Sequence, residues 1–145
     1  MTGRPEEQQR LIQEWLVLAE EDLLLAQELH DNSSSHLRAI CFHSQQAAEK
    51  FLKALLASKG ISFERTHDIE NLVNHLPPEL ADPLRTHNIL DLTEYAVETS
   101  YPSHAAMEID QTDADRAVAS AHLVAEHVRK FCQSKNKPPD QTIGS

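Results

Sequence analysis

Apolar residues recur along most of this chain at steps of three and four positions, the spacing that places side chains on one side of an α-helix. The pattern starts near Arg10 and is interrupted at residues 31–35, at Gly60, at residues 77–78 and over residues 100–110. Alternating β-branched runs are absent, and glycine occurs only three times. The sequence therefore predicts an all-α fold, an antiparallel bundle of about five helices in which a short link joins the first two.

The first predicted helix carries a carboxylate on its apolar side. Asp22 occupies the position that completes an apolar stripe at steps of four and three, between Leu18 and Leu25. Buried charges persist only when they are paired, so Asp22 either binds a neighbouring helix, lies at the edge of the stripe, or belongs to a site. Before about Gln8 the chain is polar and contains Pro5, so we expect a loose start. The stripe consists of Leu11, Trp15, Leu18, Leu25 and Leu29.

The second predicted helix has two faces and ends at Gly60, a residue that accepts the left-handed conformation common at a helix C-terminus. Polar residues 31–35 precede it and can cap its first turn. One face is apolar enough to pack in a core. The other presents an imidazole, an amide and two ammonium groups, either as an ordinary solvent-exposed face or as a binding surface. The apolar face comprises Ile40, Ala47, Phe51 and Leu55, and the polar stripe comprises His43, Gln46, Lys50 and Lys53.

A short helix is predicted after the connector that follows Gly60. Thr66 or Asp68 supplies its N-terminal cap, and the two prolines at residues 77–78 terminate it. His67 and Asp68 are also candidate site residues. Capping is the alternative interpretation of this pair, because a carboxylate before a helix accepts hydrogen bonds from free backbone amides.

The second half of the chain is predicted to contain two more helices separated by a loop. The first runs from after the prolines to about Thr99, and the second starts at residues 112–115. Residues 100–110 lie between them and include Tyr101 and His104. A loop of this length is frequently functional, so it is the most site-like loop of the sequence.

The composition fits one domain over residues 10–133, followed by a polar tail over residues 134–145 that we expect to be disordered. Cys41 and Cys132 lie in apolar helical patterns, which indicates buried free thiols and a reducing cytoplasm as the location. No apolar segment is long enough to cross a bilayer, so we expect a soluble protein without membrane contact.

Charge and motifs restrict the chemistry. The net charge of −10 argues against non-specific attraction to nucleic acid phosphate but leaves room for a local basic groove. None of the nine histidines pair at the four-residue spacing of zinc proteases, and His122 and His127 lie five positions apart. Glycine-rich phosphate loops, Gly-x-Ser-x-Gly elbows and Cys-x-x-Cys pairs are absent. We therefore expect no metal and no cofactor.

Several of these features together resemble the HEPN family (higher eukaryote and prokaryote nucleotide-binding domain) over about residues 10–133. The resemblance implies a helical bundle that dimerises and is often encoded beside a minimal nucleotidyltransferase, with which it forms a toxin–antitoxin pair. Many members of the family are RNA-cleaving toxins, and others are described only as nucleotide-binding. The similarity rests on residues 15–19, Asp22-Leu23 and Ala26, on Phe-His-Ser-Gln-Gln-Ala-Ala-Glu-Lys at residues 42–50, on His67-Asp68-Ile69, and on Tyr101-Pro102.

The resemblance also shows a departure from the family's nuclease signature, an arginine followed a few residues later by a histidine (Arg-x4-6-His). That arginine would directly precede Tyr101, where this chain has Ser100. His104 is present as a candidate catalytic residue, but the cation that would stabilise a developing phosphorane is missing. Arg38 and His43 fit the spacing by chance, because residues five apart lie on different sides of a helix.

The candidate site is expected where the polar stripe of the second helix meets the connector and the loop. Lysine would attract a phosphate, the histidines would donate hydrogen bonds and gain charge as pH falls, and Tyr101 would stack on a base. The predicted nucleotide- or RNA-binding residues are Asp22, His43, Gln46, Lys50, His67, Asp68 and Tyr101.

Three functions compete on this basis. The favoured one is a HEPN-type nucleotide- or RNA-binding homodimer that acts with a nucleotidyltransferase partner and has little or no nuclease activity. The second is a metal-independent ribonuclease toxin in which His104 or His43 is the general base. The third is a purely structural helical dimerisation module whose polar stripe only faces water.

Overall fold

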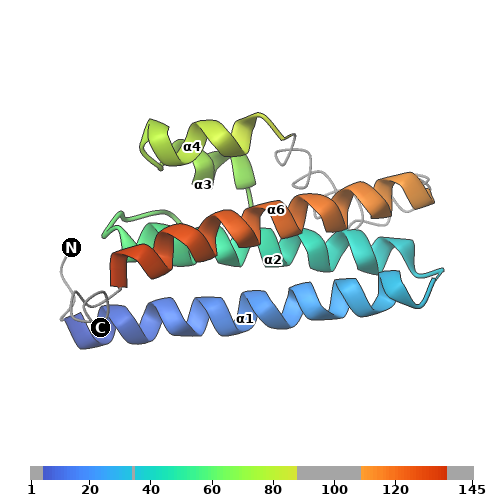
Figure 1. The fold of residues 1–145 in the computed structure, drawn as a ribbon, viewed down its shortest axis with the longest axis horizontal. Helices are drawn as coiled ribbons and strands as arrows, with labels where there is room; N and C mark the ends of the chain where they lie inside the picture. Colours follow the sequence, from blue (N-terminus) through green and yellow to red (C-terminus); the bar gives the residue numbers. More distant parts are fainter. Residues whose placement is uncertain (1–4, 34, 88–108, 137–145) are drawn as a thin grey trace, which may run out of the picture.

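The computed structural model describes residues 5–33, 35–87 and 109–136. Within these ranges the chain forms five helices and no strand, so the all-α prediction is confirmed. Figure 1 shows α1 and α2 as an antiparallel hairpin, with α6 beside α2 and α3 and α4 on the side of α6 away from α1. The helices are α1 (Pro5–Asp31), α2 (Leu37–Ser58), α3 (Ile69–Asn74), α4 (Pro78–Arg85) and α6 (Gln111–Asn136).

Helix α2 is the centre of the bundle. It packs against both other long helices, α1 and α6, and against α3. All residues from 51 to 58 are buried, so this half of α2 is enclosed on every side. The predicted two-faced helix is therefore amphipathic only in its first half. Lys53, expected on an exposed polar stripe, is buried, and its ammonium lies beside Trp15 of α1 and the Glu49 carboxylate.

Helix α1 differs from its prediction at both its start and its buried face. It begins at Pro5, whose fixed φ suits a first helical turn, so the loose start expected before about Gln8 is wrong for residues 5–8, and residues 1–4 lie outside the described ranges. Its predicted stripe is also displaced, because Leu11, Leu18 and Leu25 are exposed. The side chains that pack inward are Ile12, Ala19, Leu23 and Ala26.

Alanine explains this displacement. Ala19 and Ala26 on α1 pack in the same core as Ala47 and Ala48 on α2, all at 0% exposure. Small side chains let two helix backbones approach closely, whereas the three exposed leucines of the predicted stripe are left on the outside. An interpretation based on the largest apolar residues therefore selects the wrong side of this helix.

The helix ends follow local chemistry in three of four cases. Gly60 has φ 70°, and its N–H and that of Ile61 donate to Ala57 and Leu56, which forms a Schellman motif as expected. Asp68 caps α3 through Glu70 N–H and Asn71 N–H. Asp110 and Asp113 cap α6 reciprocally. The N-cap of α2 is His36, one residue after the predicted capping residues 31–35, and its side chain makes no cap bond; Ser34 lies outside the described residues.

The second half of the chain is described only in part. Helix α4 ends at Arg85, so one continuous helix up to Thr99 is wrong, and residues 88–108 lie outside the described ranges. Helix α6 continues to Asn136, three residues past the end expected for the domain. Its predicted apolar stripe is confirmed as buried: Ala114, Val118, Ala121, Ala125, Val128 and Cys132.

Both cysteines are free and buried, as the sequence indicates. Burial, helped by the nearby charges of Asp113 and Asp110, raises the pKa of the Cys41 thiol to about 12. Burial also raises the pKa of Cys132. Thiols that stay protonated are poor nucleophiles, so these two side chains act as small apolar core residues. Among the described helices, none has an apolar stretch that would span a membrane.

Candidate functional site

Asp22 connects α1 to α2 through two side chains, an imidazole and an ammonium group. Its Oδ1 lies 2.9 Å from Nδ1 of His43, and its Oδ2 accepts a hydrogen bond of 2.6 Å from Nζ of Lys50. His43 and Lys50 are seven residues apart, two turns of helix, so both lie above the same part of α1. All three side chains are partly exposed: 14% for Asp22, 27% for His43 and 22% for Lys50. We call these three residues the Asp22 cluster.

A second carboxylate, that of Glu49 on α2, also contacts one lysine and one histidine. Glu49 accepts from Nζ of Lys53 at 2.8 Å, and its carboxylate lies 3.0 Å from Nδ1 of His67. Gln45 donates from Nε2 to Glu49 at 2.9 Å and, at 3.3 Å, to the carbonyl of His67. Glu49 is 2% exposed, whereas the His67 side chain is 70% exposed. We call Gln45, Glu49, Lys53 and His67 the Glu49 cluster.

Gln46 joins the two clusters. Its Nε2 donates to Oε1 of Gln45 at 3.2 Å, and Gln46 itself lies one turn of helix from both His43 and Lys50. Spacings of three, four and seven residues place all of these side chains along one polar side of α2. Helix α1 borders this side through Asp22, and the connector between α2 and α3 borders it through His67.

Trp15 covers part of the Glu49 cluster from α1. The Nζ atom of Lys53 lies 5.1 Å from the centre of its indole ring, a cation–π contact. Nε1 of Trp15 is buried without a hydrogen-bond partner among the described residues. The Lys53 ammonium therefore lies between a carboxylate and an aromatic face. These two contacts stabilise the charge of a lysine side chain that is only 7% exposed.

The predicted site residues divide into four groups. Asp22, His43, Gln46 and Lys50 are brought together, and Asp22 binds a neighbouring helix, as one interpretation of this residue required. His67 belongs to the adjoining cluster. Asp68 caps α3, so the capping interpretation is confirmed for that residue. Tyr101 and His104 lie outside the described residues.

The sequence did not single out Glu49 and Gln45 as site residues, and it placed Lys53 on the exposed polar stripe and not in a buried ion pair. Glu49 and Lys53 form an i,i+4 ion pair, and Gln45 lies one turn before Glu49. The available signal was a carboxylate inside an otherwise apolar stretch with a lysine four positions later. What the pattern did not contain was His67, which reaches Glu49 from 18 residues away.

Charge pairing determines what the polar side can bind. Asp22 balances Lys50, so an approaching anion meets a cation that already has a carboxylate partner. The Nε2 atom of His43 lies across the imidazole ring from the nitrogen that faces Asp22. Protonation of this ring adds one positive charge to the cluster. An anion at this surface would therefore compete with Asp22 for Lys50.

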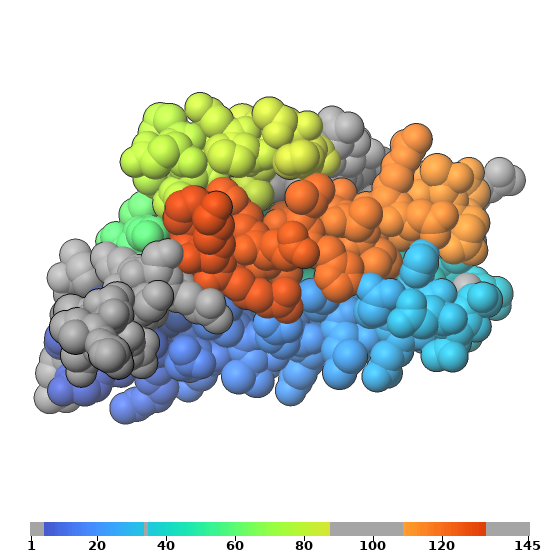
Figure 2. Space-filling view, in the orientation of Figure 1, coloured from blue at the N-terminus to red at the C-terminus, as the bar shows by residue number. Residues whose placement is uncertain are grey.

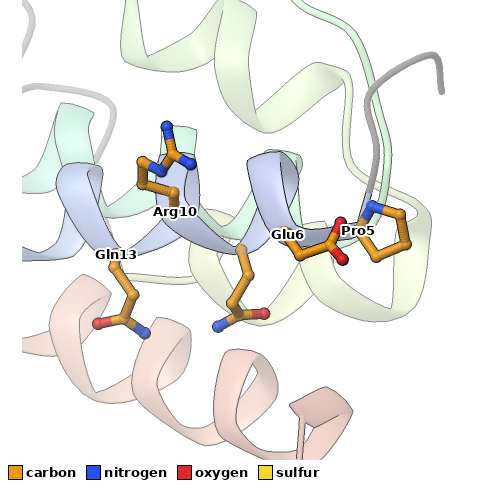
Figure 3. A pocket seen from close by; sticks show the side chains of 5 residues that line it. Pro5, Glu6, Arg10 and Gln13 are labelled. Atoms are coloured by element: carbon orange, nitrogen blue, oxygen red, sulfur yellow. The ribbon is translucent and has the colours of Figure 1, made fainter.

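Two hollows of the described surface lie away from the Asp22 cluster. One of about 580 Å³ follows the first turns of α1 and is lined by Pro5, Glu6, Gln9, Arg10 and Gln13 (Figure 3). Another of about 230 Å³ lies between α4 and α6. Neither is lined by a predicted site residue. Over the described ranges, no three histidine, cysteine, aspartate or glutamate side chains are grouped as metal ligands.

Comparison with known proteins agrees with the fold. The sequence model of the HEPN domain family matches residues 12–131, which is most of the chain. The chain therefore belongs to the HEPN domain family. A crystal structure of ST0689, an archaeal HEPN homologue, is similar with 25% identity and a TM-score of 0.61. That of TT1696 from Thermus thermophilus is similar with 26% identity and a TM-score of 0.67. Each comparison covers 83% of this chain and 97% of the other. No curated protein matches significantly.

Proposed function

We propose that this HEPN domain binds a nucleotide or an RNA end through the polar side of α2. The observation that supports this proposal is the Asp22 cluster, where a lysine and a histidine are held together on a partly exposed surface of an acidic protein. Lys50 attracts a phosphate, and the Gln46 amide beside it offers a further hydrogen bond. The acidic remainder of the chain repels long polyanions that bind without specificity.

Asp22 has two roles in this proposal. It orients the His43 ring through Nδ1, and it keeps the Lys50 ammonium on the polar side of the helix while no ligand is bound. A bound phosphate either shares Lys50 with Asp22 or replaces Asp22 as the partner of Lys50. Since Asp22 carries a negative charge beside the phosphate position, removing that charge strengthens binding, provided that Asp22 itself makes no contact with the ligand.

Calorimetric titration with ATP, GTP and a short RNA tests the proposal. Lys50→Ala weakens binding, whereas the matched control Lys59→Ala, at the C-terminal cap of α2, leaves it nearly unchanged. Asp22→Asn tightens binding, and added salt weakens it in the parent protein. Equal losses in the two lysine variants, or no binding of any of the three ligands by the parent, contradict the proposal.

A ribonuclease is the second candidate, because the contact between Asp22 and His43 is one that general bases use. A carboxylate on Nδ1 fixes the tautomer and leaves Nε2 to take a proton from a ribose hydroxyl. Ser100 argues against this function, since the family's arginine is missing there. Cleavage of a labelled RNA in EDTA, lost in His43→Ala, supports the ribonuclease, and His104→Ala tests the other histidine. Intact RNA after prolonged incubation excludes it.

For assembly, we propose a homodimer that acts with a minimal nucleotidyltransferase, in the manner of a toxin–antitoxin pair. Membership of the HEPN family supports this proposal. Light scattering at micromolar concentration then gives about twice the chain mass. Co-expression with a nucleotidyltransferase encoded beside the chain gives a stable complex. A monomer that forms no such complex contradicts both parts. A dimer without ligand binding leaves the purely structural module as the function.

A further inference from the structure

Helix α1 exposes a set of large apolar side chains on the side away from α2. It lies along one edge of the molecule, with α2 and α6 on one side of it (Figures 1 and 2). Isolated exposed leucines are ordinary, but a group on one helix face marks an interaction surface. The exposed fractions are 44% for Leu11, 55% for Val17, 42% for Leu18, 59% for Leu24 and 39% for Leu25.

The spacing of these side chains fits a helical partner. Leu11, Leu18 and Leu25 form one row at seven-residue steps, and Val17 and Leu24 form a second row at the same step. A seven-residue repeat keeps apolar positions facing a second helix, as in coiled coils. From Leu11 to Leu25 the face is about 21 Å long, enough for four turns of a partner. We call these five residues the outer face of α1.

Glutamates run along the outer face. Glu14, Glu21 and Glu28 also repeat every seven residues, and all three are exposed. On a helix their positions fall between the two apolar rows. Arg10 lies one turn of helix before Glu14, and the face remains negative in sum. A partner that carries lysine or arginine beside its apolar residues would therefore be complementary in both charge and shape.

The same glutamates disfavour a second copy of the chain as the occupant. Two copies of α1 packed through this face would bring two rows of glutamates to one seam, where like charges repel. The chain does not supply a cationic segment of its own either. Residues 88–108 contain four acidic residues and neither lysine nor arginine, and residues 137–145 contain one lysine and two prolines.

From apolar spacing and charge together, we infer that the outer face of α1 binds a cationic amphipathic helix of another protein. The surface goes beyond the nucleotide-binding proposal and does not depend on it. Leu18 and Leu25 lie one turn before and one turn after Asp22, so a bound helix ends beside the Asp22 cluster. Val17 and Leu24 lie on the far side of the face and report on the docked helix alone.

Fluorescence anisotropy with synthetic peptides tests the inference on the full chain. The probe is a labelled peptide of about three heptads, with leucine at two positions of each heptad and lysine beside them. The matched peptide carries glutamate in place of lysine. Because each buried leucine or valine contributes to affinity, Val17→Ser and Leu24→Ser each raise Kd about ten-fold. Glu14→Gln with Glu21→Gln raises Kd and reduces its salt dependence. Glu79→Gln, on α4, is the charge control and leaves Kd unchanged.

Three results overturn the inference. One is a parent protein that does not bind the lysine peptide, or that binds the glutamate peptide as tightly. Another is equal affinity in the parent, Leu24→Ser and the glutamine double variant. The last is a parent dimer that becomes a monomer in Leu24→Ser, which makes a second copy the occupant. Nucleotide titrations of Leu24→Ser stay at parent values, so failure here is distinct from failure of the nucleotide proposal.

Discussion

The Asp22 cluster and the Glu49 cluster place the same chemistry in two environments. Each has one carboxylate that contacts one lysine and one histidine. Asp22 and Lys50 keep 14% and 22% of their side chains exposed, whereas Glu49 and Lys53 keep 2% and 7%. In the first cluster a ligand can replace a partner at little cost, because water solvates the group that is released. In the second, release leaves a buried charge.

The difference in burial assigns a role to each cluster. The Glu49 cluster fixes the connector between α2 and α3 onto α2, through both the ring and the carbonyl of His67. The Asp22 cluster connects only the two helices of the hairpin and remains open on one side. We therefore expect substitutions in the Glu49 cluster to act on folding and those in the Asp22 cluster to act on binding.

The largest expected effect is on stability. Glu49→Ala leaves the buried Lys53 ammonium without its carboxylate and lowers the free energy of unfolding by about 3–5 kcal/mol. Asp22→Ala, the matched change at the exposed cluster, lowers it by about 1 kcal/mol or less. Urea denaturation followed by circular dichroism measures both. Similar losses in the two variants would remove the distinction between the clusters.

Double-mutant cycles sharpen the same comparison. The cycle for Glu49 and Lys53 gives a coupling energy of about 2 kcal/mol or more, because a low-dielectric environment strengthens their attraction. The cycle for Asp22 and Lys50 gives less than about 1 kcal/mol, because water screens a partly exposed pair. Alanine replaces the acids and methionine the lysines, with unfolding in urea as the measurement. A larger coupling in the Asp22 pair would reverse the assignment.

Substitutions of His43 and His67 are expected to have similarly small effects on stability but different effects on binding and on local exchange. His67→Gln and His43→Gln each change stability by less than about 1 kcal/mol, since both rings are partly or mostly exposed. His67→Gln speeds amide hydrogen exchange in residues 61–68, which lose a contact to α2. His43→Gln leaves that exchange unchanged and weakens nucleotide binding. Mass spectrometry of the exchanged protein and calorimetry separate the two outcomes.

The smallest effect comes from His127, remote from both clusters on α6. Burial lowers the pKa of His127, although its hydrogen bond with the Leu80 carbonyl opposes the shift. The unfolded chain then takes up this proton more readily than the folded one, so stability falls as pH drops below about 6.5. His127→Gln flattens this slope in urea midpoints measured between about pH 7.5 and 5.5. An unchanged slope would contradict the role assigned to His127.

Local signals in the sequence predicted the helical class, the buried stripe of α6, the Gly60 motif and the Asp68 cap. Each of these features depends on a few residues close in sequence, which favour one local structure. They also placed His43, Gln46 and Lys50 on one side of a helix, since helical spacing alone fixes that relation. Asp22 was recognisable as a charge in need of a partner, but its partners were not.

Tertiary packing decided the rest. The sequence offered α1 two apolar sides, and only contact with the alanines of α2 selected Ala19 and Ala26 over Leu18 and Leu25. Lys53 likewise lies against Trp15, which belongs to α1 and not to its own helix. Whether a charged side chain holds the fold or remains available to a ligand is set by how much water reaches it. That exposure comes from segments distant in the chain, which residue spacing does not encode.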